Sequence, residues 1–405
     1  NYNADHNGWS VYGTGHVDKT GAQVVPDPGV VIYDFSGAMV GSAGAGPQTQ
    51  PPKGPTAGEP VNLSSGLFVY NKTDLVLSDV IPVSLTRTYR QNDSWSRPFG
   101  IGASHPYEIF LGGNGQEFGT TPYVDLILED GARIHFIGNG PGPNYTSYLN
   151  SSAGTPWYGA IISTAPVNPN GYTLPGEWQL QTKDGTIYSF PGAFGLDNPG
   201  CQALIEITDR YGNQVKITRN TDANCTISQI TSPSGRYIQF VYDSSYRVKT
   251  ATDNIGRQVQ YSYDASGRLQ TVTDANGGVC TYGYDSLNRM TTIQDPLQIT
   301  YLTNVYNSAG MVYQQYLADG TSFYQFNWTT TSNTQNVTFG TSSGSGGPAA
   351  YQVLAFRSCN TCSEGFDPLV TQVNIVDPRG YTRQVIFNLN GYPSSDTLAL
   401  GKPEQ

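Results

Sequence analysis

A short motif recurs three times between Ser232 and Asp295, and this repetition constrains the fold more than any other feature of the sequence. Each copy opens with a turn-like segment, continues through an alternating run to a Tyr-Asp pair, and closes with a second turn. The tyrosines of the three pairs, Tyr242, Tyr263 and Tyr284, are 21 residues apart. A fixed spacing in this range indicates a stacked array of repeated units.

One unit of the array predicts a β-hairpin. Alternation in the run 258–263 puts Val259, Tyr261 and Tyr263 on one face of a strand and the Gln and Ser side chains on the other. The following turn, 264–267, offers an Asp that can bond the backbone and a Gly suited to positive φ. A single hairpin cannot bury its apolar face, so neighbouring hairpins are expected to join in one continuous antiparallel sheet.

The repeats resemble the YD repeats of the RHS family, which comprises rearrangement-hotspot and teneurin-like proteins. The resemblance lies in the Tyr-Asp pair, the Gly-Arg that follows it, the Asp-x-x-Gly opener and the spacing. Residues 61–111 resemble the domain that precedes the repeats in bacterial RHS proteins, through Val61–Gly66, Thr73–Leu75 and Pro82–Tyr89, although Ala103 stands where that family usually has Trp. The resemblance implies an all-β fold, a curved and spiralling antiparallel sheet of stacked hairpins forming an open shell segment, in which the repeats are structural.

Composition and the spacing of the repeated motif divide the chain into five expected segments. They are an N-terminal arm with a strand (1–42), a Pro/Gly linker (43–60), a pre-repeat β domain (61–200), the YD repeats (201–320), and degenerate repeats with a C-terminal tail (321–405). Within the arm, Trp9–Tyr12 is a short strand candidate and Val30–Phe35 a stronger one. The tail stops in the middle of the pattern, so we expect truncation or proteolytic maturation there.

The balance of charged residues narrows the classes of partner. Only 13% of the residues are charged, while Gly and Tyr are abundant at 47 and 28, which suits extensive sheet with tight turns. A formal net charge of −10 argues against nucleic acid and anionic membrane as partners. The sequence has no apolar run long enough for a transmembrane helix, so membrane insertion is not expected.

Two pairs of cysteines are disulfide candidates. Cys201 and Cys225 lie at opposite ends of a predicted hairpin. Cys359 and Cys362 fit a short-loop disulfide, half of a zinc site or a redox pair; for a secreted protein a disulfide is favoured, because no further zinc ligands lie nearby. Cys280 is expected to be a buried free thiol within its strand.

No constellation of catalytic residues is visible. The four histidines, His6, His16, His105 and His135, are scattered and are expected to be core or surface residues. The recurring Asp243, Asp264 and Asp285 stand at turns, where an Asp usually caps the backbone. The sequence therefore predicts a protein that is not an enzyme and has no cofactor and no metal site.

The sequence also contains candidates for glycan attachment and glycan binding. Asn-x-Ser/Thr sites occur at Asn62, Asn71, Asn92, Asn144, Asn150, Asn224, Asn327 and Asn336. Four aromatic residues, Tyr145, Tyr148, Trp157 and Tyr158, fit either sugar stacking or packing against their own sheet.

Three hypotheses for function follow. The first is a secreted or cell-surface structural protein that assembles with copies of itself into a filament or fibre. Its assembly strand would be Val30, Val31, Ile32, Tyr33, Asp34 and Phe35, which fits the sheet edge of a neighbouring copy as well as an edge of its own sheet. The second is the N-terminal part of an RHS toxin-encapsulating shell. The third is a carbohydrate-binding or adhesin module, with glycans as partners.

Overall fold

The computed structural model describes residues 2–3, 8–9, 15–17, 24–26, 55–91, 93, 96–113, 123–129, 133–138, 147–150, 157–164, 178–191, 199–331, 369–387 and 393–398. The chain divides into two compact units, residues 1–44 and 45–405. The first unit contains two short hairpins, β1 (Tyr2–Asn3) with β2 (Gly8–Trp9) and β3 (Gly15–Val17) with β4 (Val24–Pro26). The proposed assembly strand, 30–35, lies outside the described residues.

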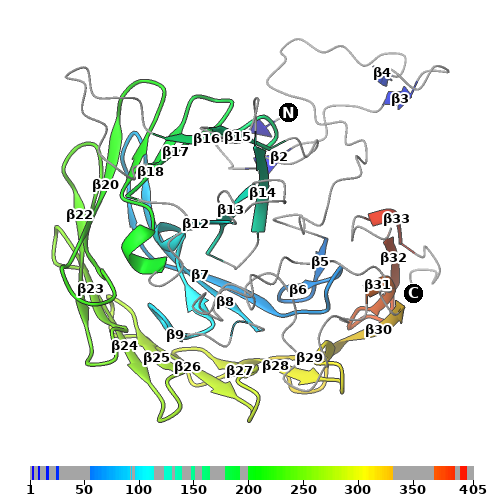
Figure 1. Ribbon diagram of the computed structural model, residues 1–405. Coiled ribbons are helices and arrows are strands. Elements are labelled where there is room, and N and C mark those ends of the chain that lie inside the picture. Colours follow the sequence, from blue (N-terminus) through cyan, green and yellow to red (C-terminus); the bar gives the residue numbers. More distant parts are fainter. Residues whose placement is uncertain are drawn as a thin grey trace, which may run out of the picture. The chain divides into compact units, whose positions relative to one another are not determined.

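The second unit is dominated by one antiparallel sheet of 22 strands, which pair strictly in chain order from β12 to β33 (Figure 1). The strands are β12 (Phe110–Gly113), β13 (Tyr123–Ile127), β14 (Arg133–Gly138), β15 (Ser147–Leu149), β16 (Ile161–Thr164), β17 (Trp178–Gln181), β18 (Ile187–Phe190), β19 (Glu206–Thr208), β20 (Gln214–Arg219), β21 (Ile227–Thr231), β22 (Tyr237–Tyr242), β23 (Val248–Asp253), β24 (Gln258–Tyr263), β25 (Leu269–Thr273), β26 (Val279–Tyr284), β27 (Met290–Gln294), β28 (Thr300–Tyr306), β29 (Val312–Leu317), β30 (Phe323–Thr331), β31 (Leu369–Val376), β32 (Thr382–Phe387) and β33 (Pro393–Leu398). The predicted fold, an open all-β array of stacked hairpins, is confirmed. The sheet passes without a break through residues 200 and 320, where the sequence suggested segment boundaries; the division into five segments stays a prediction.

The two faces of the sheet differ as the alternation predicts. In β24, Val259 and Tyr261 are buried while Gln258, Gln260 and Ser262 are exposed. Side chains from the buried face of successive repeats join a single apolar core. Because register fixes which face each side chain occupies, the pairing of β24 with its neighbours is strongly specified.

Residues 55–109 lie against the buried face of this sheet, and we call them the strap. They form three small sheets, β5 (Thr56–Ala57) with β6 (Val61–Asn62), β7 (Val69–Leu77) with β8 (Val83–Arg90) and β11 (Ala103–Ser104), and β9 (Ser96–Arg97) with β10 (Gly100–Ile101), followed by the 3-10 turn η1 (Pro106–Glu108). Strands β20 to β30 follow one another around β7 and β8 (Figure 1). The strap therefore fills the concave side of the large sheet, which we call the wall, and the two share one apolar core.

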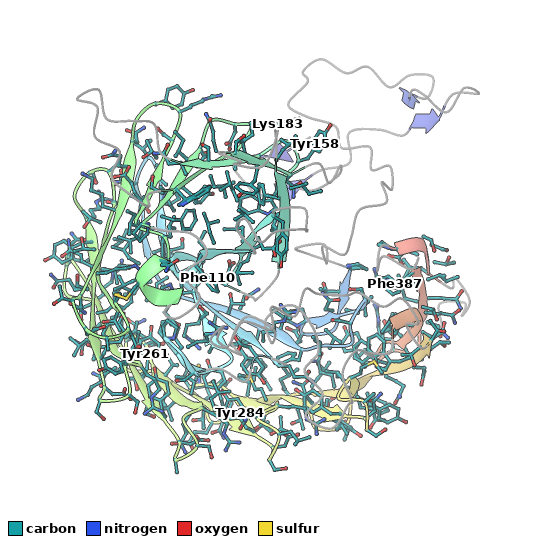
Figure 2. The ribbon with its side chains drawn as sticks, in the orientation of Figure 1. Phe110, Tyr158, Lys183, Tyr261, Tyr284 and Phe387 are labelled. Atoms are coloured by element: carbon teal, nitrogen blue, oxygen red, sulfur yellow. A yellow bond between two sulfur atoms is a disulfide. The ribbon has the colours of Figure 1, made fainter. Side chains whose placement is uncertain are left out.

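The first strand of the large sheet does not have a free edge along its whole length. Phe110 in β12 forms an isolated bridge with Ala203, and the Leu204 N–H donates to the Ile109 carbonyl at 2.9 Å. Phe110, Ile127 and Ala203 form a second, smaller core (Figure 2). The strands β12 to β18 thus bend far enough for β12 to meet the segment that leads into β19.

Among the described residues, no helix is both long enough and apolar enough to span a membrane.

Candidate functional site

The repeat turns are built around one Asp and one Arg. In the turn after β24, Oδ1 of Asp264 accepts hydrogen bonds from the backbone N–H groups of Ser266 at 2.9 Å and Arg268 at 3.0 Å, and its Oδ2 accepts from Nε of Arg268 at 2.7 Å. Gly267 has φ +85°, which an L side chain would strain. The turns at Asp243 and Asp285 repeat this arrangement. The predicted capping role of these aspartates is confirmed.

The electrostatics of this turn favour the ionised carboxylate. Burial alone would raise the pKa of Asp264, but the hydrogen bonds from the backbone and guanidinium of Arg268 outweigh it, and the pKa lies below its usual value. The Asp-Arg pair is consequently charged at neutral pH. Such pairs are modest contributors by themselves, so their value lies in the geometry that they impose on the next repeat.

The arginine of each turn holds the tyrosine of the next repeat. Arg268 lies over the ring of Tyr284, 5.1 Å from its centroid, and the Tyr284 hydroxyl donates to the Leu269 carbonyl at 2.9 Å. The same two contacts occur one repeat earlier: Arg247 lies over the ring of Tyr263, and the Tyr263 hydroxyl donates to the Val248 carbonyl at 2.6 Å. Each repeat is therefore completed by the one that follows it. We call this series of contacts the tyrosine ladder.

The tyrosine ladder continues beyond Tyr284. The Tyr306 hydroxyl donates to the Met290 carbonyl at 2.6 Å, below the guanidinium of Arg289. One repeat later, Trp328 takes the position of the tyrosine and its Nε1 donates to the Val312 carbonyl at 2.6 Å. Burial raises the pKa of these tyrosines well above the ordinary value, as at Tyr284, so the ladder stays neutral and its donors stay protonated at physiological pH.

The strap runs along the ladder in the direction opposite to the order of the repeats. Its first residues meet the last strands: the Glu59 N–H donates to Oε1 of Gln315 in β29 at 2.6 Å, and Arg383 in β32 donates to the Thr56 carbonyl at 3.0 Å. Near its end the strap meets an early strand, because Arg219 in β20 donates to the Glu108 carboxylate at 3.3 Å. One continuous segment therefore braces strands from β20 to β32.

A buried ion pair lies at the centre of this contact. Nε of Arg87 donates to Asp74 at 2.6 Å, and both side chains are only 4% exposed. The Tyr261 hydroxyl donates to the same carboxylate at 2.7 Å, and the guanidinium donates to the Tyr282 hydroxyl at 3.2 Å. The cluster thus joins β7 and β8 of the strap to β24 and β26 of the wall. Asp74 and Arg87 both belong to the strap, so a shifted strap would keep the ion pair but lose the hydrogen bonds to Tyr261 and Tyr282, and these bonds favour one register of docking.

Both rims of the sheet add hydrogen bonds to the strap. At one rim, the Asp79 carboxylate accepts from the Ser232 hydroxyl at 2.6 Å and the Ser234 N–H at 3.0 Å, and these bonds hold its pKa well below the usual value. At the other rim, the Tyr89 hydroxyl donates to the Asn288 carbonyl at 3.0 Å and accepts from the Met290 N–H at 2.9 Å. The strap is consequently fixed across the full width of the repeats.

Two protein families match these two parts of the chain. The family described as RHS Repeat matches residues 247–279 and 263–300, which include Tyr263 and Tyr284 of the tyrosine ladder. The chain contains RHS repeats. A domain of unknown function, DUF6531, matches residues 58–136, which include most of the strap. The resemblance to RHS proteins is confirmed, and with it an RHS-type structural role for this sheet.

The solved structures that match this chain are much longer chains. The crystal structure of TcdB2-TccC3-Cdc42 is 11% identical over 82% of this chain and 19% of that chain, with a TM-score of 0.29. The crystal structure of TcdB2-TccC3-TEV is 12% identical with the same coverage and a TM-score of 0.27. This chain therefore spans about a fifth of the length of those chains. Among the curated proteins, none matches it.

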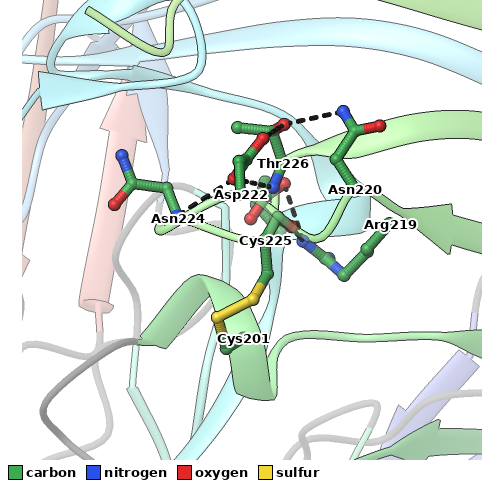
Figure 3. Close-up of a disulfide and its surroundings, with 8 residues drawn as sticks. Cys201, Arg219, Asn220, Asp222, Asn224, Cys225 and Thr226 are labelled. Atoms are coloured by element: carbon green, nitrogen blue, oxygen red, sulfur yellow. Dashed lines mark hydrogen bonds and ion pairs between the residues drawn. A yellow bond between two sulfur atoms is a disulfide. The ribbon is translucent and has the colours of Figure 1, made fainter.

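A disulfide lies next to the contact between β12 and the segment that leads into β19. Cys201 in η2 (Pro199–Gln202) is bonded to Cys225, as the sequence suggested (Figure 3). In the turn that carries Cys225, Oδ1 of Asp222 accepts from the backbone N–H groups of Asn224 at 3.0 Å and Thr226 at 3.1 Å. The bond thus pins η2, which precedes the bridge to β12, to the turn between β20 and β21.

The other cysteine predictions have different outcomes. Cys359 and Cys362 lie outside the described residues, so their disulfide stays a prediction. Cys280 carries a free thiol in β26, but it is half-buried rather than buried. The correction has a simple reason: the exposed residues 71–73 of the strap leave that part of the inner face only partly covered.

His105 is the one predicted histidine with a described side chain, and it is a core residue. It is fully buried between Phe99 and Phe240, and its Nδ1 accepts from the Tyr107 N–H at 3.3 Å. Burial, assisted by the nearby Arg219, lowers its pKa to about 3, so the ring is neutral. Among the described residues, no group of three His, Cys, Asp or Glu side chains could hold a metal.

The asparagines of the candidate glycosylation sites differ in their exposure to solvent. Asn71, Asn224 and Asn327 are exposed and Asn62 is half-buried, whereas Asn150 is 1% exposed and leaves no room for an attached glycan. Asn92, Asn144 and Asn336 lie outside the described residues. Glycosylation at the accessible sites stays a prediction.

The aromatic residues near β15 and β16 do not form a sugar-stacking platform. Tyr148 is buried in the core, and Trp157 packs against Tyr188 with ring centroids 6.2 Å apart. Only Tyr158 is well exposed, at 45%, and Nζ of Lys183 lies 4.2 Å from its ring centroid (Figure 2). Tyr145 lies outside the described residues. Of the two alternatives that the sequence left open, packing against the sheet holds for Tyr148 and Trp157.

Proposed function

We propose that this protein is a secreted or cell-surface structural wall that joins copies of itself, with the strand 30–35 of one copy adding to the sheet edge of another. The observation that carries the proposal is the edge strand β33. All six of its side chains are exposed, and among the described residues it pairs only with β32. An exposed edge with unpaired backbone groups is a template for strand addition.

The asymmetry of the two edges gives the proposed assembly a direction. At β12 the edge is bridged by Ala203 and reinforced by the Cys201–Cys225 bond. At β33 no such cover is found in the described part of the chain. A donor strand from a second copy would meet an accepting edge at β33, and head-to-tail contact of this kind builds open filaments.

The wall itself suits a load-bearing role. The tyrosine ladder links each RHS repeat to the next, and the strap crosses many of them, so force on one strand is shared by its neighbours. A disulfide fits an oxidising location outside the cell, and this supports the secreted or surface placement.

Electron microscopy of the full chain tests the assembly. Wild-type protein should form filaments whose abundance rises with concentration. Ile32→Pro should abolish them, because proline removes a backbone donor and fixes φ in the proposed donor strand. Gln48→Pro places the same residue in the Pro-rich linker and should leave filaments intact.

Two outcomes would contradict the proposal. Monodisperse particles at every concentration would exclude polymerisation and favour the alternative of a shell segment. Filaments of Ile32→Pro equal in length and number to those of wild type would show that another segment makes the contact.

A further inference from the structure

From β21 to β33, the outward face of the large sheet is almost free of charge, and Lys249 at the bulge in β23 is the one charged strand residue there. From β21 to β33, every strand position that cross-strand register places on this face is Gln, Thr, Ser, Asn, Gly or an uncharged apolar or aromatic residue. The polar members are Gln229, Thr231, Gln239, Thr250, Thr252, Gln258, Gln260, Ser262, Thr271, Thr273, Thr281, Thr292, Gln294, Thr300, Thr303, Gln314, Gln325, Asn327, Thr329, Gln372, Asn374, Thr382, Gln384, Ser395 and Thr397. We call this surface the amide face.

A surface of this composition is unusual for a soluble protein. For comparison, about 25–35% of a designed soluble surface is made of Lys, Arg, Glu and Asp. In this part of the sheet most charges sit in the turns, as in the Asp264–Arg268 pair. The nearest lysines are Lys216, one strand before the amide face, and Lys249, at a bulge near its rim. The near-absence of charge is therefore a property of the strands and not of the chain as a whole.

The amides of this face are already oriented by one another. Nε2 of Gln239 donates to Oε1 of Gln229 at 3.0 Å, and Nε2 of Gln229 donates to the Thr231 hydroxyl at 2.7 Å. Two strands further, Nε2 of Gln260 donates to Oε1 of Gln258 at 3.2 Å. A primary amide has two donor hydrogens and an oxygen with two acceptor sites, so each linked side chain keeps capacity for a partner while its rotamer is restrained.

Aromatic rings interrupt the amide rows near β29 and β30. Tyr316 and Phe323 are cross-strand neighbours with ring centroids 5.1 Å apart. The Tyr316 hydroxyl donates to Gln314 at 3.1 Å, and Nε2 of Gln314 donates to Gln325 at 2.8 Å. A flat apolar ring beside fixed amides offers both a stacking surface and directed hydrogen bonds.

The chemistry of the face excludes most large partners. Nucleic acid and anionic membranes are held by Lys and Arg, of which the amide face has only Lys249 near its rim. Stable protein interfaces have aromatic and Arg-rich apolar cores, whereas the apolar residues here, such as Val241 and Val279, are scattered. A neutral polymer dense in hydroxyl groups fits, because every hydroxyl both donates and accepts.

We propose that the amide face binds a neutral polysaccharide laid across the strands. The amides changed in the test below, Gln239 and Gln260, lie in β22 and β24 and not in β33, so binding at the amide face can be tested separately from the proposed assembly. Since charge takes no part, binding should persist at high salt, unlike any contact carried by the Asp-Arg turns.

Co-sedimentation with insoluble cellulose, chitin and curdlan tests the inference. The full chain should be depleted from solution by at least one of the three polymers, saturably and equally at 0.05 and about 0.5 M NaCl. The double variant Gln239→Glu/Gln260→Glu should bind at least about tenfold more weakly, because two carboxylates lose their donors and carry a hydration cost into the contact. Asn254→Asp makes the same chemical change at an exposed rim turn and should bind as wild type does.

The controls separate loss of binding from loss of fold. The variants should match wild type in far-UV circular dichroism and Tm. If no neutral polymer depletes the wild type, or if the double variant binds as well as wild type does, the proposal is overturned. Sedimentation velocity supplies a third outcome: self-association of the wild type that the double variant abolishes would assign the face to a second copy and overturn the polysaccharide.

Discussion

The contact between Gly100 of the strap and the turn at Gly267 allows a sharp test of strap docking. Gly100 has φ +86°, and a Cβ at this position would lie 2.6 Å from the Gly267 carbonyl oxygen. Gly277 has nearly the same φ, +85°, but a Cβ there would meet nothing within 4 Å. Alanine at either site pays the same backbone penalty, about 1–2 kcal/mol. Only Gly100→Ala must also push strap and wall apart.

The extra cost at Gly100 can be estimated from the contacts it would break. Relieving the overlap costs about 1–3 kcal/mol as overpacking. The Ile101 N–H donates to the Gly267 carbonyl at 3.1 Å, and losing that bond adds about 0.5–1.5 kcal/mol. With unfolding entropy near 2.1 cal/mol/K per residue, a chain of 405 residues loses about 1 °C of Tm per kcal/mol.

Thermal unfolding of the two variants measures the difference. Gly277→Ala should lower Tm by about 1–2 °C, and Gly100→Ala by about 3–6 °C. Limited proteolysis should also cut the strap faster in Gly100→Ala alone, since its docking is weakened. Equal Tm values for the two variants would refute the close approach of strap and wall.

Three further predictions follow from the buried and cross-linked groups. Arg87→Met should lower the free energy of unfolding in urea by about 3–5 kcal/mol, because it leaves the buried carboxylate of Asp74 without its ion-pair partner. A loss below about 1 kcal/mol would contradict this. Replacing Cys201 and Cys225 by Ser should lower stability by about 3–4 kcal/mol, the loop entropy for a separation of 24 residues, and should remove the effect of dithiothreitol that wild type shows. The depressed pKa of Asp264 means that its ion pair stabilises the fold above about pH 4 and progressively less below it; Asp264→Asn should therefore cost up to about 1 kcal/mol at pH 7 and progressively less as the pH falls below about 4, and a loss of stability that does not change with pH would contradict this.

The hairpins were predictable because each carries its own local signals. The run 258–263 shows which side chains are buried, and the turn 264–267 shows where the chain reverses, since the capping Asp and the Gly lie within four residues of each other. The buried face of β24 and the role of Asp264 could therefore be read without any distant information. Alternation likewise placed Val83, Leu85 and the stem of Arg87 on one side of β8, and all three are buried.

The placement of the strap was not predictable, because its partners are far away in the chain. Alternation suggested burial for the stem of Arg87 but not for its guanidinium, which donates to Tyr282, 195 residues away, while its partner Asp74 accepts from Tyr261, 187 residues away. Spacing within a repeat contains no information on what fills the hollow side of the sheet. The half-buried state of Cys280 has the same origin, because it depends on where the strap stops covering β26.

The nearly uncharged outward face could have been noticed from the strand positions, yet its meaning depends on register. A slip by one residue would move Gln260 inward and Tyr261 outward. Only the observed pairing of Gln260 with Thr250 and Thr273 shows that these polar side chains form one surface.

Because the strap runs opposite to the order of the repeats, its length limits the number of repeats that it can cross. Tyr70 meets Tyr301, and Glu59 meets Gln315 one strand further along. Duplicating a unit near Tyr284 would displace both partners by two strands, and a strap of the present length could reach only one side of the insertion. Changes in repeat number within this span must therefore be matched by changes in strap length, while units beyond β32 are free to multiply or disappear.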